Sequence, residues 1–184
     1  MKNTEQVAPQ EQPMMIEIAR PEDAEAVVRI QKETWLATYP NEEHGITVED
    51  ILAKGLGSPE RAERWRKTIA EQADQDHLWM AKQGGNVVGY CYAKKDAEEG
   101  KISALYVLPS AQGKGAGRKL MTEALTWLGT DKPISLGVVT FNAKAIAFYK
   151  SFGFHETTEP PEEIPPLPSG KRMPQLKMKR DRQG

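Results

Sequence analysis

The pattern of hydrophobic and polar positions divides the chain into short strands and amphipathic helices. Apolar and polar residues alternate in Met15–Ala19, which predicts a first strand. Two later apolar stretches, Leu78–Ala81 and Val87–Tyr92, flank Gly84-Gly85-Asn86, a composition typical of a hairpin turn. Further strands are predicted at 102–108, at Ile134–Val139 and near Met173–Met178.

Apolar residues recur at helical spacing in the segments between these strands. A first helix is expected to begin at Pro21 and to fade near Tyr39, and Thr47 and Ser58 have the side chains of helix N-caps. A later helix shows its apolar stripe at Leu120, Met121, Ala124, Leu125 and Leu128. Asn142 is expected to cap a last helix, whose apolar positions are Ala145, Phe148, Tyr149 and Phe152.

The order of these elements favours an α+β fold built on a mixed sheet. A strand and helices come first, then three strands that suit antiparallel pairing, then helix, strand, helix and strand. This order does not suit a doubly wound parallel sheet. We expect a flexible N-terminal tail at 1–14, one domain at 15–180 and a C-terminal tail at 181–184.

Composition restricts the compartment and the fold size. A chain of 184 residues with 39% hydrophobic content suits a single compact domain. Cys91 is the only cysteine, so no internal disulfide is possible and a reducing compartment is favoured. No stretch resembles a signal peptide or a membrane span of about 20 apolar residues. We therefore expect a cytoplasmic protein without a membrane partner.

Net charge and the spacing of potential metal ligands argue against a nucleic-acid-binding protein and against a metalloprotein. Lys and Arg number 25 against 26 Asp and Glu, and the net charge of −1 disfavours nucleic-acid binding. The three histidines and one cysteine show no spacing typical of metal ligands, so no metal is expected. His77 and His155 are candidates for a base by their chemistry alone, and an ordinary surface role is favoured for each.

A glycine-rich segment, Gln112–Gly117, follows the predicted strand at 102–108. Three of its six residues are glycine, at the point where a strand gives way to a helix. A Walker loop needs Ser or Thr after its Lys, whereas Lys114 is followed by Gly115. A dinucleotide-binding fingerprint needs Gly-x-Gly-x-x-Gly, and the spacing here is one residue too short.

The pattern Gln-x-x-Gly-x-Gly does fit, with Gln112, Gly115 and Gly117 at its fixed positions. Glycines allow close approach of a ligand to the backbone, and the first N–H groups of a helix lack internal partners. Together with the helix dipole, these donors bind a pyrophosphate without a metal. The alternative is a flexible turn, and the glycines alone do not decide between the two.

The surrounding residues resemble the GNAT superfamily of acyl-CoA-dependent N-acyltransferases. The strand end Leu105–Pro109 precedes the glycine pattern, and a second family feature stands at Asn142–Tyr149 and continues to Phe154. The segment Glu33–Tyr39 is similar to the first helix of many members. The resemblance spans roughly Ile16 to Lys179. It implies an N-acetyltransferase with a mostly antiparallel sheet, splayed at the cofactor-binding strand and flanked by helices.

The resemblance implies acetyl-CoA as the co-substrate. The main chain at Tyr106 and Val107 is expected to hold the pantetheine arm like an added strand. The phosphates are expected at the backbone N–H groups of Gly113, Lys114, Gly115, Ala116, Gly117 and Arg118. The side chains of Lys114 and Arg118 either add charge-assisted contacts or are solvated. Asn142 matches the family asparagine near the cofactor and also suits a plain N-cap.

The resemblance also implies direct attack of a neutral amine on the thioester. Tyr149 matches the tyrosine that protonates the leaving thiolate, although its apolar stripe also suits a core role. A backbone N–H near Val107 is expected to stabilise the developing oxyanion. The chain lacks the glutamate that some members carry on the strand matching 101–105. A water relayed by Ser103, or else Glu33, is the expected substitute as base.

The acceptor side is expected to hold aromatic and acidic residues. In the family this cleft is lined by the first two helices and the loop before the last strand. Here these segments contribute Glu33, Trp35, Tyr39, Glu42, Glu43, Asp50, Glu159, Glu162 and Glu163. Such residues favour a cationic acceptor, for example a polyamine-like molecule or a basic peptide terminus. The alternative is that the carboxylates only solvate the surface.

A second function from another class stays open. The chain is either an N-acetyltransferase or a non-catalytic acyl-CoA-binding sensor or interaction module. Tyr149 favours the enzyme, whereas the missing strand carboxylate leaves the sensor open. The sequence does not identify the acceptor amine, and whether the chain forms a homodimer is also left open.

Overall fold

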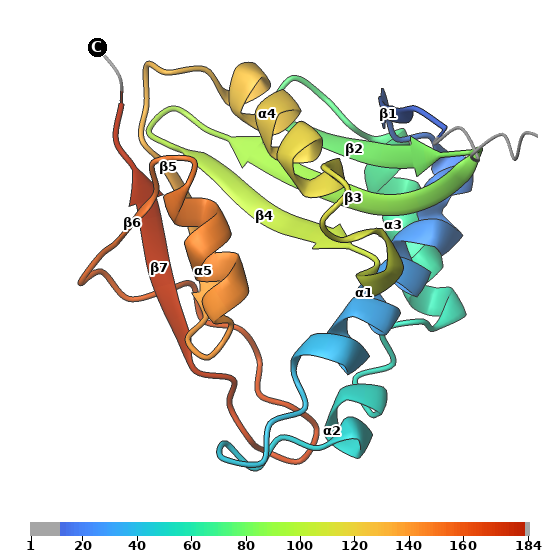
Figure 1. Cartoon of the computed structure of the whole chain (residues 1–184), viewed down its shortest axis with the longest axis vertical. Helices are drawn as coiled ribbons and strands as arrows, with labels where there is room; N and C mark the ends of the chain where they lie inside the picture. The colour runs from blue at the N-terminus through green and yellow to red at the C-terminus, as the bar shows by residue number, and fades with distance from the viewer. Residues whose placement is uncertain (1–11, 183–184) are drawn as a thin grey trace, which may run out of the picture.

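The computed structural model describes residues 12–182, which form a seven-stranded mixed sheet flanked by helices (Figure 1). The sheet order is β1-β2-β3-β4-β5-β7-β6. Its strands are β1 (Met14–Ile18), β2 (Asp76–Gln83), β3 (Asn86–Lys95), β4 (Gly100–Val107), β5 (Ile134–Val139), β6 (His155–Glu156) and β7 (Gln175–Arg180). All pairings are antiparallel except that of β4 with β5. The α+β class expected from the sequence is confirmed.

The helices cover both faces of this sheet. They are α1 (Ala24–Thr38), α2 (Val48–Leu52), α3 (Pro59–Ala70), α4 (Ala116–Leu128) and α5 (Ala143–Lys150). Three begin at the N-caps expected from the sequence, because Thr47, Ser58 and Asn142 each accept a hydrogen bond from a backbone N–H three residues later. No helix within 12–182 has the length and apolar character needed to cross a membrane.

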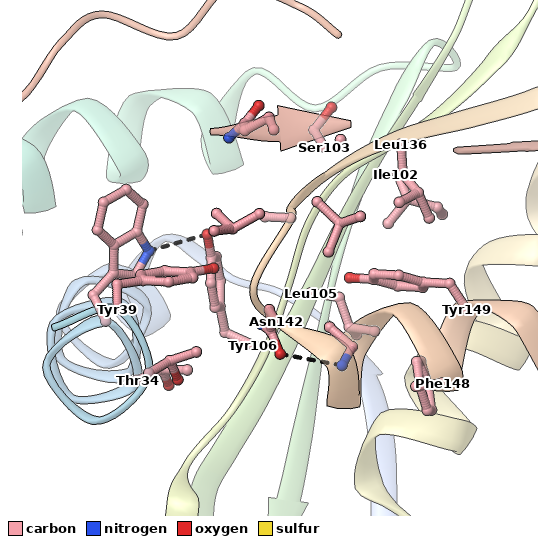
Figure 2. A pocket seen from close by; sticks show the side chains of 18 of the residues that line it. Thr34, Tyr39, Ile102, Ser103, Leu105, Tyr106, Leu136, Asn142, Phe148 and Tyr149 are labelled. Atoms are coloured by element: carbon pink, nitrogen blue, oxygen red, sulfur yellow. Dashed lines mark hydrogen bonds between the residues drawn. The ribbon is translucent and has the colours of Figure 1, made fainter. Parts of the chain in front are cut away.

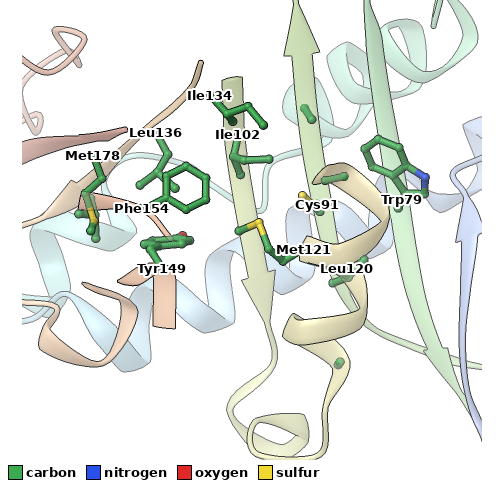
Figure 3. Packing of buried hydrophobic residues seen from close by; sticks show 14 of the residues in the cluster. Trp79, Cys91, Ile102, Leu120, Met121, Ile134, Leu136, Tyr149, Phe154 and Met178 are labelled. Atoms are coloured by element: carbon green, nitrogen blue, oxygen red, sulfur yellow. The ribbon is translucent and has the colours of Figure 1, made fainter. Parts of the chain in front are cut away.

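The two faces have separate hydrophobic cores. On one face, α1 and α3 pack against inward residues of β2 and β3 such as Leu78, Met80 and Tyr90. On the other, Leu120 and Met121 of α4 pack against Cys91, as Figure 3 shows. Complete burial raises the pKa of the Cys91 thiol, so it stays protonated and acts as a small core residue.

The parallel strands β4 and β5 pair over only three residues. Gly100, Lys101 and Ile102 lie opposite Ile134, Ser135 and Leu136, and beyond these positions the two strands separate (Figure 1). A register shift in the β3–β4 pairing follows Ile102, because Ala93 pairs with Ile102 while Tyr92 pairs with Ala104. Such a bulge bends the strand that contains the extra residue. As a result, the second half of β4 has no strand partner on its β5 side.

The boundaries differ from expectation in a few places. β1 begins at Met14 rather than Met15, and β7 runs from Gln175 to Arg180 rather than from Met173 to Met178. The two-residue strand β6 was not predicted, because His155 and Glu156 are both polar and exposed and show no alternation. Of the expected tails at 1–14 and 181–184, residues 1–11 and 183–184 lie outside the described residues, and Met14 belongs to β1.

The buried carboxylate of Asp50 joins α2 to the loop before β7. It accepts hydrogen bonds from the Thr47 backbone and from Lys171 Nζ, each at 2.9 Å. Hydrogen bonds from Ser169, Thr47 and Lys171 hold the pKa of Asp50 well below its ordinary value. Because the folded-state pKa is depressed, this stabilisation is complete above the unfolded pKa of about 3.9 and is lost as pH falls below it.

We predict that Asp50→Asn lowers the thermal midpoint at pH 7 by about 2–4 °C. The difference from the wild type should shrink below about pH 4, because the Asp50 carboxylate of the unfolded wild type then begins to be protonated while that of the folded protein stays charged. Thermal melts monitored by circular dichroism between pH 3 and pH 8 measure both effects. The exposed neighbour Glu49, changed to Gln, is the control. A difference in thermal midpoint between the wild type and Asp50→Asn that stays constant down to pH 3 would contradict the proposed linkage.

Candidate functional site

A cavity of about 1120 Å³ lies where β4 and β5 separate. Its walls come from β4, β5, α1, α4, α5 and the proline-rich segment 160–165. Figure 2 shows side chains from α1, β4 and α5 converging on this space. The volume exceeds the range of about 300–1,000 Å³ found for pockets that hold drug-sized ligands. The cavity therefore has room for an extended ligand together with a second molecule.

The glycine-rich segment forms an open helix N-terminus at one end of the cavity. Gly113 and Gly115 have φ angles of 80° and 87°, a left-handed conformation that favours glycine. A Cβ atom at either position would meet nothing within 4 Å, so both border open space. Gly115 is the N-cap of α4, and no side chain of the described residues caps it. The first N–H groups of α4 thus remain available to an anion.

The side chain of Gln112 connects this segment to its neighbours. Its Nε2 donates to the Val107 carbonyl at 3.1 Å, and its Oε1 accepts from Lys144 Nζ at 2.7 Å. Gln112 therefore links the end of β4 to the start of α5. The sequence identified Gln112 but not Lys144, whose only signal was its position two residues after Asn142.

The free edge of β4 exposes the peptide group of Val107. Val107 lies opposite Gly89 of β3, and the next N–H, that of Leu108, donates to the Val88 carbonyl at 2.8 Å. In an antiparallel ladder this pattern turns the peptide groups of Val107 away from β3 and those of Tyr106 toward it. Val107 thus presents its N–H on the side where β5 has diverged, whereas the backbone of Tyr106 is engaged in the sheet.

Tyr149 of α5 belongs both to the core and to the cavity wall. Its side chain is 8% exposed and packs edge-on against Phe148 and Phe154. Figure 2 shows the phenol oxygen directed into the cavity, toward β4. Burial raises the pKa of Tyr149 well above its ordinary value, so the phenol remains protonated and can donate a hydrogen bond.

Aromatic side chains line the half of the cavity next to α1. Trp35 Nε1 donates to the phenol oxygen of Tyr106 at 3.0 Å, and the ring of Tyr39 packs edge-on against Trp35 at 4.9 Å. All three residues line the cavity. The phenol of Tyr106 therefore faces α1, on the opposite side of the sheet from α4.

Not every expected site residue reaches the cavity. Gly113, Gly115, Gly117, Arg118 and Asn142 line it. Lys114 is exposed and Ala116, the first residue of α4, is buried, and neither side chain contributes to the wall.

Glu33 also lies outside the cavity wall. Its side chain is 48% exposed and pairs with Arg29 at 3.5 Å, one helical turn earlier on α1. Ser103, the other candidate for relaying a proton, does line the cavity.

The carboxylates expected to attract a cation are engaged elsewhere. Asp50 is bound by Lys171, Glu162 by Lys101 and Glu163 by Arg172. Glu159 is bound by Lys177 and Lys179, and these hydrogen bonds lower its pKa to about 2. Glu42 and Glu43 are exposed and do not line the cavity. The electrostatic reason for expecting a cationic acceptor is thereby removed, because these charges are neutralised or remote.

Two cations that the sequence analysis did not single out line the cavity beside α1. They are Lys54, after α2, and Arg61, in the first turn of α3. In the sequence both look like ordinary surface charges, and only the packing of α2 and α3 against α1 brings them to the cavity.

Comparison with known proteins gives a consistent family. The model of the "Acetyltransferase (GNAT) family" matches residues 25–154. Mycothiol acetyltransferase of Amycolatopsis mediterranei is 30% identical over 149 residues, which are 74% of this chain and 44% of that protein. N-alpha-acetyltransferase RimI of Mycobacterium tuberculosis is 34% identical over 83 residues, covering 43% of this chain and 52% of that protein. The chain thus spans about half the length, or less, of these relatives.

Solved structures share the fold. The PaiA N-acetyltransferase of Thermoplasma acidophilum, in complex with coenzyme A, has a TM-score of 0.70 at 19% identity, covering 92% of this chain and 99% of that one. The ribosomal-protein-S18-alanine N-acetyltransferase of Escherichia coli has a TM-score of 0.65 at 21% identity, covering 94% and 96%. The splayed strands and the glycine-rich helix start are therefore explained by the family match, and this chain belongs to the GNAT family of acetyltransferases.

Proposed function

We propose that this protein is an N-acetyltransferase that transfers the acetyl group of acetyl-CoA to a primary amine of a small molecule or peptide by direct attack. One observation carries the proposal: the unpaired edge of β4 and the uncapped N-terminus of α4 border the same cavity. The first can pair with an extended amide-containing chain and the second can bind phosphates. Acetyl-CoA contains both kinds of group and supplies an acetyl group activated as a thioester.

The residues of α4 bind the phosphates in this proposal. The N–H groups between Gly113 and Arg118 donate to the phosphate oxygens, and the Arg118 side chain adds positive charge from the cavity wall. Lys144 is held against Gln112 at the same end of the cavity and adds a second cation. Lys114, being exposed, contributes only through its backbone.

The edge of β4 positions the acyl end. The Val107 N–H faces the space that β5 leaves open and donates to the amide-containing arm or to the carbonyl oxygen under attack. The backbone of Tyr106 is engaged with β3, so we assign the cofactor contact to Val107. The phenol of Tyr106, bound to Trp35, instead forms part of the acceptor side.

Tyr149 is proposed as the general acid. The N-cap of Asn142 fixes the start of α5, and Tyr149 lies two helical turns further on with its phenol directed into the cavity. A protonated phenol at this place donates its proton to the departing thiolate. We propose that the acceptor ammonium loses its proton before it attacks, passing it through a water molecule held by Ser103 to bulk solvent, because Ser103 lines the cavity whereas Glu33 does not.

The acceptor class and the location are also proposals. Small amines, polyamines and peptide N-termini all present the primary amine that this chemistry requires. The mycothiol acetyltransferases and RimI, which the chain resembles, are named as acetyltransferases of different acceptors, so the relatives do not decide among these. The single buried thiol fits a reducing compartment, and we propose a cytoplasmic location.

A turnover assay tests the proposed function directly. The purified chain is incubated with acetyl-CoA and a panel of amines, and free thiol release is measured together with the mass of each product. Transfer to at least one amine is the expected result. Tight binding of acetyl-CoA without transfer to any amine would instead favour the non-catalytic sensor.

We predict that Gly117→Glu weakens acetyl-CoA binding by at least about 100-fold, because its carboxylate would repel the phosphates at the start of α4. The fold should tolerate the change, since a Cβ at Gly117 meets Phe148 and Val107 only at 3.7 Å and acidic residues suit a helix N-terminus. Isothermal titration calorimetry measures the affinity. Thr122→Glu, which adds the same charge on the exposed second turn of α4, should bind normally. Equal affinities for both variants would exclude this phosphate site.

We predict that Tyr149→Phe lowers kcat by about 10–10³-fold while acetyl-CoA affinity changes little. The ring keeps its packing against Phe148 and Phe154, and only the proton donor is lost. Because burial raises the pKa of Tyr149, the wild-type enzyme should keep its donor up to about pH 10, the ordinary tyrosine value. A single-turnover rate constant in the variant equal to that of the wild type would show that Tyr149 serves only in packing.

A further inference from the structure

Lys54 and Arg61 form a pair of cations without a carboxylate partner at the acceptor side of the cavity. Lys54 Nζ lies 5.4 Å above the ring of Trp35, and both side chains line the cavity. Neither makes an ion pair with any residue in 12–182. Lys101 and Lys177, which also line the cavity, are by contrast bound by Glu162 and Glu159.

The position of this pair is electrostatically unfavourable in the absence of an anion. Burial and, next, the charge of Arg61 lower the pKa of Lys54, and burial is also the main cause that lowers the pKa of Arg61. Two neighbouring positive charges that are partly removed from water repel each other. A bound anion would replace the lost hydration and offset this repulsion.

The adjacent wall has unused hydrogen-bonding atoms. Gln31 Oε1 and Thr34 Oγ1 on α1 are buried and have no hydrogen-bond partner among the described residues. Thr34 is only 7% exposed, and both side chains line the same cavity. Buried polar atoms are nearly always paired, so these oxygens indicate a ligand that carries donors such as N–H or O–H groups.

These groups lie on the opposite face of the sheet from the proposed phosphate site. α1 and α3 pack against Tyr90 and Tyr92, whereas α4 packs against the other face of β3 through residues such as Cys91. Arg61 lies near Tyr90, within range of its electrostatic influence. Lys54 and Arg61 therefore face the second molecule in the cavity.

We infer that the acceptor is a primary amine that also carries an anionic group, a carboxylate or a phosphate, which Lys54 and Arg61 bind. Its donor groups pair with Gln31 and Thr34, next to the phenol of Tyr106. This inference rests on the proposed function, because only an acetyltransferase has an acceptor. It replaces the cationic acceptor expected from the sequence with an amphoteric one, because Lys54 and Arg61 make no ion pair in the described part of the chain, whereas the carboxylates expected to attract a cation are paired or lie outside the cavity wall.

Matched pairs of amines provide the first test. β-Alanine is compared with β-alaninamide, and phosphoethanolamine with ethanolamine, by thiol release and product mass. The wild type should prefer at least one anionic member by about tenfold or more in kcat/KM, as expected for one charge-assisted contact. The preference should disappear in Lys54→Gln/Arg61→Gln, because kcat/KM for the anionic amine falls more than kcat/KM for its neutral partner. The two pairs distinguish a carboxylate from a phosphate.

A second readout does not depend on turnover. With coenzyme A present at saturation, so that the start of α4 is occupied, succinate and inorganic phosphate are titrated by calorimetry. The wild type should bind one of them, and the double variant should bind it at least about fivefold more weakly. The matched control is Lys32→Gln/Lys67→Gln, which removes one cation of α1 and one of α3 that do not line the cavity.

The outcomes separate this inference from the proposed function. Equal or better use of the neutral amines by the wild type, or an anion preference that persists in Lys54→Gln/Arg61→Gln, would overturn the anionic-acceptor assignment while leaving the acetyltransferase intact. Absence of transfer to every amine would count against the proposed function alone. In that case, anion binding that the wild type shows and only Lys54→Gln/Arg61→Gln loses would still support the anion site. Absence of anion binding by the wild type would refute that site.

Discussion

The separation of β4 from β5 after three paired residues is the constraint on which the rest of this structure depends. A parallel pair normally continues along both strands, and each residue that leaves the ladder gives up hydrogen bonds. Here the loss creates a cavity through the middle of the sheet, open to helices on both faces. Because the unpaired peptide groups of β4 border this space, the cost of the opening is offset wherever a ligand supplies the missing partners.

Neighbouring residues of β4 direct their backbone and side-chain groups to different parts of the cavity. Val107 directs its peptide group to the open edge, while the neighbouring Tyr106 directs its side chain toward α1 and Trp35. Tyr149 approaches from the α5 side with a protonated phenol. One strand thus separates the half of the cavity proposed for the cofactor, bordered by α4 and α5, from the half proposed for the acceptor, bordered by α1 and α3.

The cations that line the cavity differ in whether a carboxylate neutralises them. Lys101 and Lys177 of the sheet are neutralised by carboxylates of the proline-rich loop, which also closes one side of the cavity. Lys54 and Arg61 have no such partner among the described residues, and burial together with the charge of Arg61 lowers the pKa of Lys54. A net charge of −1 for the whole chain gives no hint of this difference. Local pairing, rather than composition, decides what the acceptor half can bind.

The sequence by itself determined the elements, the caps at Thr47, Ser58 and Asn142, and the glycine-rich helix start, because these depend on residues within a few positions of one another. Family membership could also be predicted, since its motifs are local. Tertiary structure alone decided which charges far apart in the sequence are paired. Glu159 meets Lys177 and Asp50 meets Lys171 only because the chain folds back, while Glu33 turns outward on α1 and Arg61 turns inward on α3. Periodicity marks the apolar face of a helix, but ion pairing depends on distances between segments far apart in the chain, which no local pattern records.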